Sequence, residues 1–145
     1  MKSASKTILE FDKASVESFN LLKKALKPND GNEPSNRDVF IFAMAYGFQH
    51  GAFSHEVKRS GTGVRVQYLK PSDEVLLAAI EIAHSESTEY VTDPDHRYDL
   101  AERYAQGGIL LLVESIQDVT RYGNSLAAEL VGLLPPQEMQ EEKDS

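Results

Sequence analysis

The sequence predicts a mainly α fold: a single-domain bundle of about five helices around a buried central helix, with a small two-stranded β ribbon. Two observations carry this prediction. One internal run, Val39–Phe48, is apolar, aromatic or small throughout, and the long segments around it repeat apolar residues with helical spacing. Only two short stretches alternate with the period of a strand. A chain of 145 residues is the size of one domain and can bury a substantial core.

The central helix is predicted over Ser35–Gly51. Ser35 and Asp38 have the spacing of a capping box, which satisfies the first free backbone N–H groups of a helix. A helix that is apolar on every side is buried. Since a bilayer needs about 20 apolar residues and this run is much shorter, we expect a core helix and no membrane segment.

Strand signals lie on both sides of the central helix. Lys6–Phe11 is short and β-inclined, and the stretch from Val64 to Leu69 alternates apolar and polar residues. We expect the two to pair as the ribbon.

Capping residues mark the beginnings of two further helices. Asp12 is expected to cap a helix over Lys13–Lys27, which stops before Pro28. Ser72 is expected to cap a helix over Asp73–His84.

The longest amphipathic pattern runs from Pro94 to about Val119, with a proline in the first helical position. Gly107 and Gly108 interrupt it at a cost of about 1 kcal/mol each relative to alanine. Their small size predicts close contact with the central helix through Ala43 and Gly47, and a kink is the alternative.

The C-terminal part is predicted to hold a short last helix over Asn124–Leu134, which Pro135 and Pro136 stop. The domain is therefore expected to span residues 1–136. Residues 137–145 are acidic and are expected to form a disordered tail.

Charge is divided unevenly along the chain. The net charge is −8, but residues 1–70 carry 11 Lys and Arg against 7 Asp and Glu, whereas residues 71–145 carry 4 against 16. This asymmetry favours attraction between the halves, or between copies of the chain, over nucleic-acid binding, because the whole molecule repels phosphate. The absence of cysteine and of a signal peptide favours a cytoplasmic protein.

A basic loop is the first candidate site. Lys58, Arg59, Arg65 and Lys70 flank Ser60–Gly63, where glycines allow backbone N–H groups to face an anion. We interpret these four side chains as candidate contacts for nucleic acid or phosphate. The alternative is a solvated, mobile loop with ordinary surface charge. Neither a P-loop nor a dinucleotide fingerprint is present.

Metal ligation is the second candidate. Glu81-x-x-His84 and Asp93-x-x-His96 each place a carboxylate and an imidazole one helical turn apart. Surface histidines are the alternative, and the sequence favours them.

A second carboxylate pattern, Glu114-x-x-x-Asp118, follows Glu86-x-x-Glu89. The combination is similar to the all-α nucleotide pyrophosphohydrolases, which pair Glu-x-x-Glu with a later Glu-x-x-Asp, although the second spacing here is one residue longer. The resemblance implies a Mg²⁺ site. The candidate metal residues are Glu81, His84, Glu114 and Asp118. Solvated helix faces are the alternative.

The sequence thus favours a non-enzymatic interaction or accessory protein without a cofactor, which self-associates or docks on another protein in a larger assembly. The first alternative is a nucleic-acid-associated protein that uses the basic N-terminal half and residues 58–65. The second is a Mg²⁺-dependent nucleotide hydrolase.

Overall fold

The structure, a computed structural model, describes residues 5–27 and 31–122, with side chains as far as Gln117. Contacts divide the chain into Met1–Val113 and Glu114–Ser145. The predicted helix over Asn124–Leu134 and the predicted tail at 137–145 lie outside the described residues. The prediction of one domain over residues 1–136 stays a prediction.

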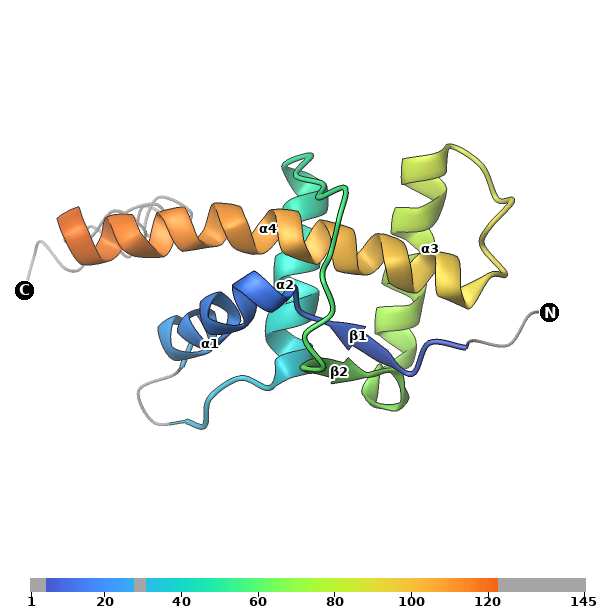
Figure 1. Ribbon diagram of the computed structural model, residues 1–145. Helices are drawn as coiled ribbons and strands as arrows, with labels where there is room; N and C mark the ends of the chain where they lie inside the picture. Colours follow the sequence, from blue (N-terminus) through green and yellow to red (C-terminus); the bar gives the residue numbers. More distant parts are fainter. Residues whose placement is uncertain (1–4, 28–30, 123–145) are drawn as a thin grey trace, which may run out of the picture. The chain divides into compact units, whose positions relative to one another are not determined.

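The described residues are mainly helical with one small sheet, as the sequence predicts (Figure 1). In chain order they form β1 (Ile8–Glu10), α1 (Val16–Ala25), α2 (Asn36–Gln49), β2 (Gly63–Arg65), α3 (Pro71–Ser85) and α4 (Pro94–Tyr122), with single 3₁₀ turns at η1 (Lys13–Ser15) and η2 (Val66–Tyr68). Among these residues, none of the helices combines the length and apolar character that crossing a bilayer requires.

The predicted ribbon is present. β1 and β2 pair antiparallel with Leu9 opposite Val64, and both of these side chains are buried. The second strand is shorter than predicted. It ends at Arg65, because the next residues turn into η2, where the Leu69 N–H donates to the Val66 carbonyl over 3.1 Å. Side chains beyond Arg65 therefore do not alternate across a sheet.

The central helix α2 is capped as predicted. The Asp38 N–H donates to Ser35 Oγ over 3.2 Å, and the Ser35 N–H donates to Asp38 Oδ2 over 3.0 Å. One face of α2 is fully buried and contributes Val39, Phe40, Ala43 and Met44 to the core. The prediction that the helix is buried all round is wrong, because the Phe42 side chain is 44% exposed.

Glycine allows α4 to cross α2 at close range, as the sequence predicts (Figure 1). A Cβ atom on Gly108 would overlap the carbonyl oxygen of Ala43, and one on Gly47 would overlap the carbonyl oxygen of Tyr104. The two backbones are therefore in direct contact. Each glycine's helix-propensity cost is offset by packing that no larger residue permits.

The helix beginnings differ in detail from the prediction. Asp12 Oδ1 accepts from the Ala14 N–H over 2.8 Å, but the first turn is the 3₁₀ turn η1. Ser72 does not cap α3. The helix begins at Pro71, two residues earlier than predicted, and the Lys70 N–H donates to Asp73 Oδ2 over 2.8 Å. Proline suits this position because its missing N–H would have had no partner in the helix.

Candidate nucleic-acid interface

A groove of about 570 Å³ opens where the end of α1, the start of α2, β2 and η2 meet. This volume lies within the range of pockets that hold small ligands, about 300–1,000 Å³. We call it the basic groove, and its lining contains three cationic side chains and no carboxylate. It is lined by Lys23, Ser35, Asn36, Arg37, Gly63, Val64, Arg65 and Tyr68.

Hydrogen bonds between elements hold the walls of the basic groove. Asn36 Nδ2, in the first turn of α2, donates to the Gly63 carbonyl of β2 over 2.9 Å. The turn that carries Tyr68 is joined to the residue just before β1, because the Val66 N–H donates to the Thr7 carbonyl over 3.0 Å. These two hydrogen bonds hold the start of α2 against β2, and η2 against the residue before β1.

Arg37 is neutralised by carboxylates outside the groove. Its Nε and Nη2 donate to the two carboxylate oxygens of Asp73, each over 2.7 Å, and its Nη1 donates to Asp38 over 2.8 Å. Burial alone would raise the pKa of Asp73, but the Arg37 guanidinium and the Lys70 N–H more than offset this and lower it. The pKa of Arg37 is raised chiefly by its hydrogen bond to Asp73. Arg37 therefore joins α2 to α3 and adds little free charge to the groove.

Arg65 differs from the other arginines whose side chains the structure describes. Arg37, Arg59, Arg97 and Arg103 each form an ion pair with Asp or Glu. Within residues 5–27 and 31–117, neither Arg65 nor Lys23 forms one. Both side chains line the basic groove. Two uncompensated cations thus face one hollow that contains no acid.

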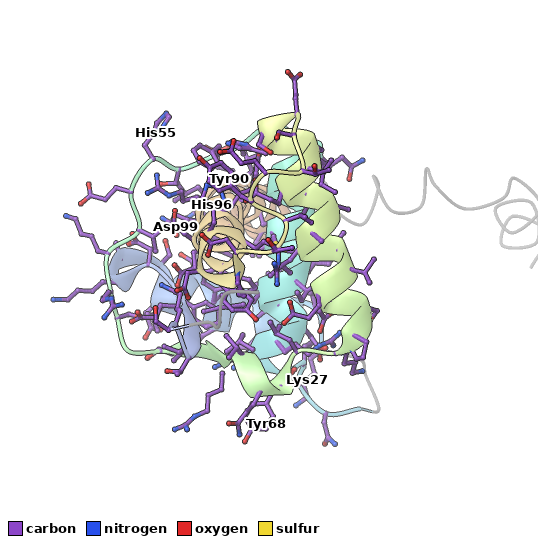
Figure 2. The ribbon with its side chains drawn as sticks, turned by 90° about the vertical axis from the view of Figure 1, so that its right-hand side faces the viewer. Lys27, His55, Tyr68, Tyr90, His96 and Asp99 are labelled. Carbon is purple, nitrogen blue, oxygen red and sulfur yellow. The ribbon has the colours of Figure 1, made fainter. Side chains whose placement is uncertain are left out.

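Tyr68 is the most exposed aromatic side chain of the described residues, at 62%. Figure 2 shows the Tyr68 side chain projecting outward at the bottom of the view. No other described ring stacks on it. The groove therefore combines an open aromatic face with free positive charge.

The four basic residues that the sequence singles out do not share one site. Arg65 lines the basic groove, whereas Arg59 lines a second hollow. Lys70 precedes α3, and the Lys58 side chain is exposed on the loop. Whether any of the four contacts nucleic acid or phosphate stays a prediction.

The glycine-containing loop does turn its backbone N–H groups toward an anion, but that anion belongs to the chain. Glu10 is buried, and its Oε1 accepts from the Ser60 N–H over 3.2 Å and from the Gly61 N–H over 2.7 Å. The Phe11 N–H also donates to the Thr62 carbonyl over 2.9 Å. These bonds attach the loop to β1.

The second hollow, about 310 Å³, contains paired charges of both signs. Buried Glu102 accepts from the Glu10 N–H over 2.6 Å, and its other oxygen pairs with Lys6 over 2.9 Å. Burial raises the pKa of Glu102. Arg59 and Arg103, which also line the hollow, face Glu10 and Asp99. These ion pairs join separate segments of the fold. Lys6, Arg59 and Arg103 are therefore already paired with carboxylates of the chain.

The Glu81 and His84 side chains have different partners. Glu81 is 0% exposed and contacts Nδ1 of His96, whose ring stacks on Tyr90 at 4.1 Å (Figure 2). Nδ1 of His84 instead forms a hydrogen bond with the Tyr104 hydroxyl over 2.7 Å. The described residues contain no group of three or more His, Asp or Glu placed to hold a metal ion.

Glu114 is exposed and belongs to Glu114–Ser145, and the side chain of Asp118 lies outside the described residues. That Glu86-x-x-Glu89 and Glu114-x-x-x-Asp118 meet around Mg²⁺ stays a prediction.

Sequence reasoning missed Lys23, Asn36 and Tyr68 as parts of one site. The alternating pattern from Val64 to Leu69 predicts Tyr68 in a strand, where its side chain would face a neighbour instead of solvent. Lys23 lies near the end of a helix about 40 residues earlier in the chain. A cluster of lysines there, at 23, 24 and 27, was the one available signal.

The model of a family described as DNA sulphur modification system-associated protein 4 matches residues 13–145. The matched segment contains every residue that lines the basic groove. No curated protein and no solved structure matches the chain.

Proposed function

The chain belongs to the family of DNA sulphur modification system-associated protein 4, and we propose that it serves such a system by contacting DNA through the basic groove. Membership makes it an accessory protein of a larger system. The proposal adds what the chain binds within that system, namely DNA. Such a role fits the cytoplasmic location that the sequence favours.

The observation that carries the proposal is the free charge of Arg65 and Lys23 in a groove without acid. DNA phosphates bind arginine and lysine by releasing condensed counterions, and this term dominates binding that does not depend on sequence. The first turn of α2, at Ser35 and Asn36, lines the same groove. Its helix dipole adds positive potential there.

The sequence alone favours protein docking over DNA contact, because the net charge is −8. The structure supports DNA contact over protein docking, because the charge that acts on a bound DNA phosphate is the local positive charge of the groove. Within residues 5–27 and 31–117, every arginine except Arg65 forms an ion pair with a carboxylate, as Arg59 and Arg103 do, whereas Arg65 and Lys23 in the groove form none. Local potential in a concave site acts at contact distance, where the net charge is partly screened.

Fluorescence anisotropy with short labelled DNA tests the proposal. We expect Arg65→Ala to weaken binding about tenfold and to reduce the slope of log K against log salt by about one unit, as the loss of one phosphate contact does. Arg59→Ala is the matched control. It removes the same charge from a side chain that is 82% exposed outside the groove, and we expect little change.

Two results would contradict DNA contact. One is the absence of any salt-sensitive DNA binding by the intact chain. The other is an equal loss in the Arg59→Ala and Arg65→Ala proteins, which would show that only total charge matters.

Self-association is the second candidate function, and α3 favours it. Val75, Ala79 and Ile82 are exposed, and their spacing places them on one face of the helix. Val75 is 69% exposed. A second copy fits this face. If two α3 helices pair antiparallel with Val75 against Ile82, Lys70 of each copy lies near Glu86 of the other, so the charges are complementary.

Sedimentation velocity tests self-association. We expect a dimer that Val75→Glu dissociates, while Leu110→Glu, at an exposed position of α4, leaves it intact. High salt should weaken the dimer, because the pairs at its ends are exposed. A protein that remains monomeric at all concentrations would rule out this function.

A further inference from the structure

We propose that the basic groove prefers unpaired DNA bases, with Tyr68 as the stacking platform. This inference rests on the proposed function, since it names the form of DNA that the same site takes. Aromatic rings beside a basic track are the combination that binds single strands, because every base has a π-face that an aromatic ring can cover. In a duplex those faces are covered by neighbouring base pairs.

Tyr68 has the exposure and the support that stacking requires. The other exposed aromatic rings have ring partners in the chain: Phe42 stacks with Tyr46, and Tyr90 with His96. Tyr68 has none among the described residues and is 62% exposed. An aromatic ring left open to water without a structural partner is a candidate contact surface.

The backbone beneath Tyr68 is held in place. η2 is closed by the bond from the Leu69 N–H to the Val66 carbonyl, and the Val66 N–H donates to Thr7. A ring on such a turn loses less conformational freedom on binding than one on a free loop. Its backbone is thus positioned before DNA arrives.

Arg65 and Lys23 complete the site, because they line the same groove as Tyr68. A nucleotide whose base covers the ring leaves its phosphate to these cations. Arg65 is three residues before Tyr68. A continuous strand is thus bound by stacking and by charge at neighbouring positions, without readout of base identity.

A unique fluorophore can report stacking directly. The chain has no tryptophan, so Tyr68→Trp introduces a single indole at the platform. We expect single-stranded oligothymidine to quench its emission, and a blunt duplex of the same length to quench it much less. Phe42→Trp, an exposed aromatic position on α2, is the control and should not respond to either DNA.

Binding measurements separate stacking from folding effects. We expect Tyr68→Leu to weaken single-strand binding about tenfold and duplex binding hardly at all, as removal of one base–aromatic contact does. Tyr68→Phe keeps the ring and should retain the single-strand preference. Circular dichroism of each variant confirms that the helices are intact.

The outcomes of these experiments distinguish the two proposals. Equal binding of single strands and duplex that Tyr68→Leu leaves unchanged would overturn the stacking platform, while a loss in Arg65→Ala would still support DNA contact. A preference for duplex would overturn it as well. If the intact chain binds neither DNA at low salt, both proposals fail.

Discussion

At the scale of single residues, the contact between Glu81 and His96 shows how buried polar groups constrain this protein. Glu81 is fully buried on α3, and among the described residues only one of its side-chain oxygens has a partner. A buried carboxyl group without hydrogen bonds is costly. The imidazole of His96 on α4 therefore does more for stability than its exposure suggests.

We expect His96→Ala to destabilise the protein by about 2–4 kcal/mol, because it leaves Glu81 buried without its partner. The double variant with Glu81→Leu should recover much of this loss, since an apolar side chain needs no partner there. Thermal unfolding followed by circular dichroism measures both. Equal stability of the wild type and the single variant would show that the contact contributes nothing.

Tyr98 gives a pH-dependent contribution at the alkaline end. Its hydroxyl donates to Glu74 over 2.9 Å, and burial together with that bond raises its pKa to about 12. Because the folded pKa lies above the unfolded value of about 10, this contribution is complete below pH 10. It is lost as the pH rises through about 12.

The corresponding loss of stability is at most about 2–3 kcal/mol over that window. We expect Tyr98→Phe to lower stability at neutral pH by about 1 kcal/mol, the usual contribution of one hydrogen bond. The same variant should reduce the fall in stability above pH 10. Urea unfolding at a series of pH values measures this. A variant whose alkaline slope equals that of the wild type would contradict the assignment.

At the scale of elements, the crossing of α2 and α4 is set by glycine. Gly47 and Gly108 bring the two backbones into contact, and Gly107 lies similarly close to the carbonyl of Ala52. Such contact leaves no space into which a side chain could relax. The helix pair thus tolerates less change than a packing of flexible side chains.

We expect Gly108→Ala to cost about 3 kcal/mol or more, although alanine is the better helix former, because its Cβ would overlap the Ala43 carbonyl. Leu110→Ala on the exposed side of α4 serves as the control and should change stability by about 0.5 kcal/mol or less. Chemical denaturation compares the two. A Gly108→Ala protein as stable as the wild type would show that the crossing can open.

This crossing was predictable because small residues at helical spacing occur in both segments. The capping box at Ser35 was predictable for a similar reason, since both partners lie within one turn. The end of β2 was not, because alternation continues to Leu69 while the chain turns at Val66. Local sequence patterns specify which helices and strands form. They specify much less about how segments that are far apart in the sequence pack together.

The basic groove could not be predicted from local sequence patterns. Lys23 and Arg65 are about 40 residues apart, and their common site depends on α1, α2 and β2 packing together. Which cations remain free is equally non-local. Arg59 has the sequence context of a contact residue, yet it faces Glu10. Pairing within the fold, which the sequence does not display, decides which charges are available.

At the scale of the whole molecule, the basic groove with its two unpaired cations belongs to a chain whose net charge is −8. If the groove contacts DNA as proposed, it attracts DNA at contact distance, and the remaining charge repels DNA over a distance set by the salt concentration. Since the Debye length is about 30 Å at 0.01 M salt and about 8 Å at 0.15 M, the repulsion matters mainly in dilute buffer. DNA affinity should therefore depend on acidic residues far away in the sequence.

Acidic residues near the C-terminus allow this to be tested by charge alone. Changing Glu138, Glu141 and Glu142 to Gln together brings the net charge from −8 to −5. We expect this to strengthen DNA binding about two- to threefold at about 0.02 M salt, with no effect above about 0.2 M. A gain that persists in high salt would contradict long-range repulsion as its cause. No gain at low salt would mean that the potential at the groove is independent of the net charge.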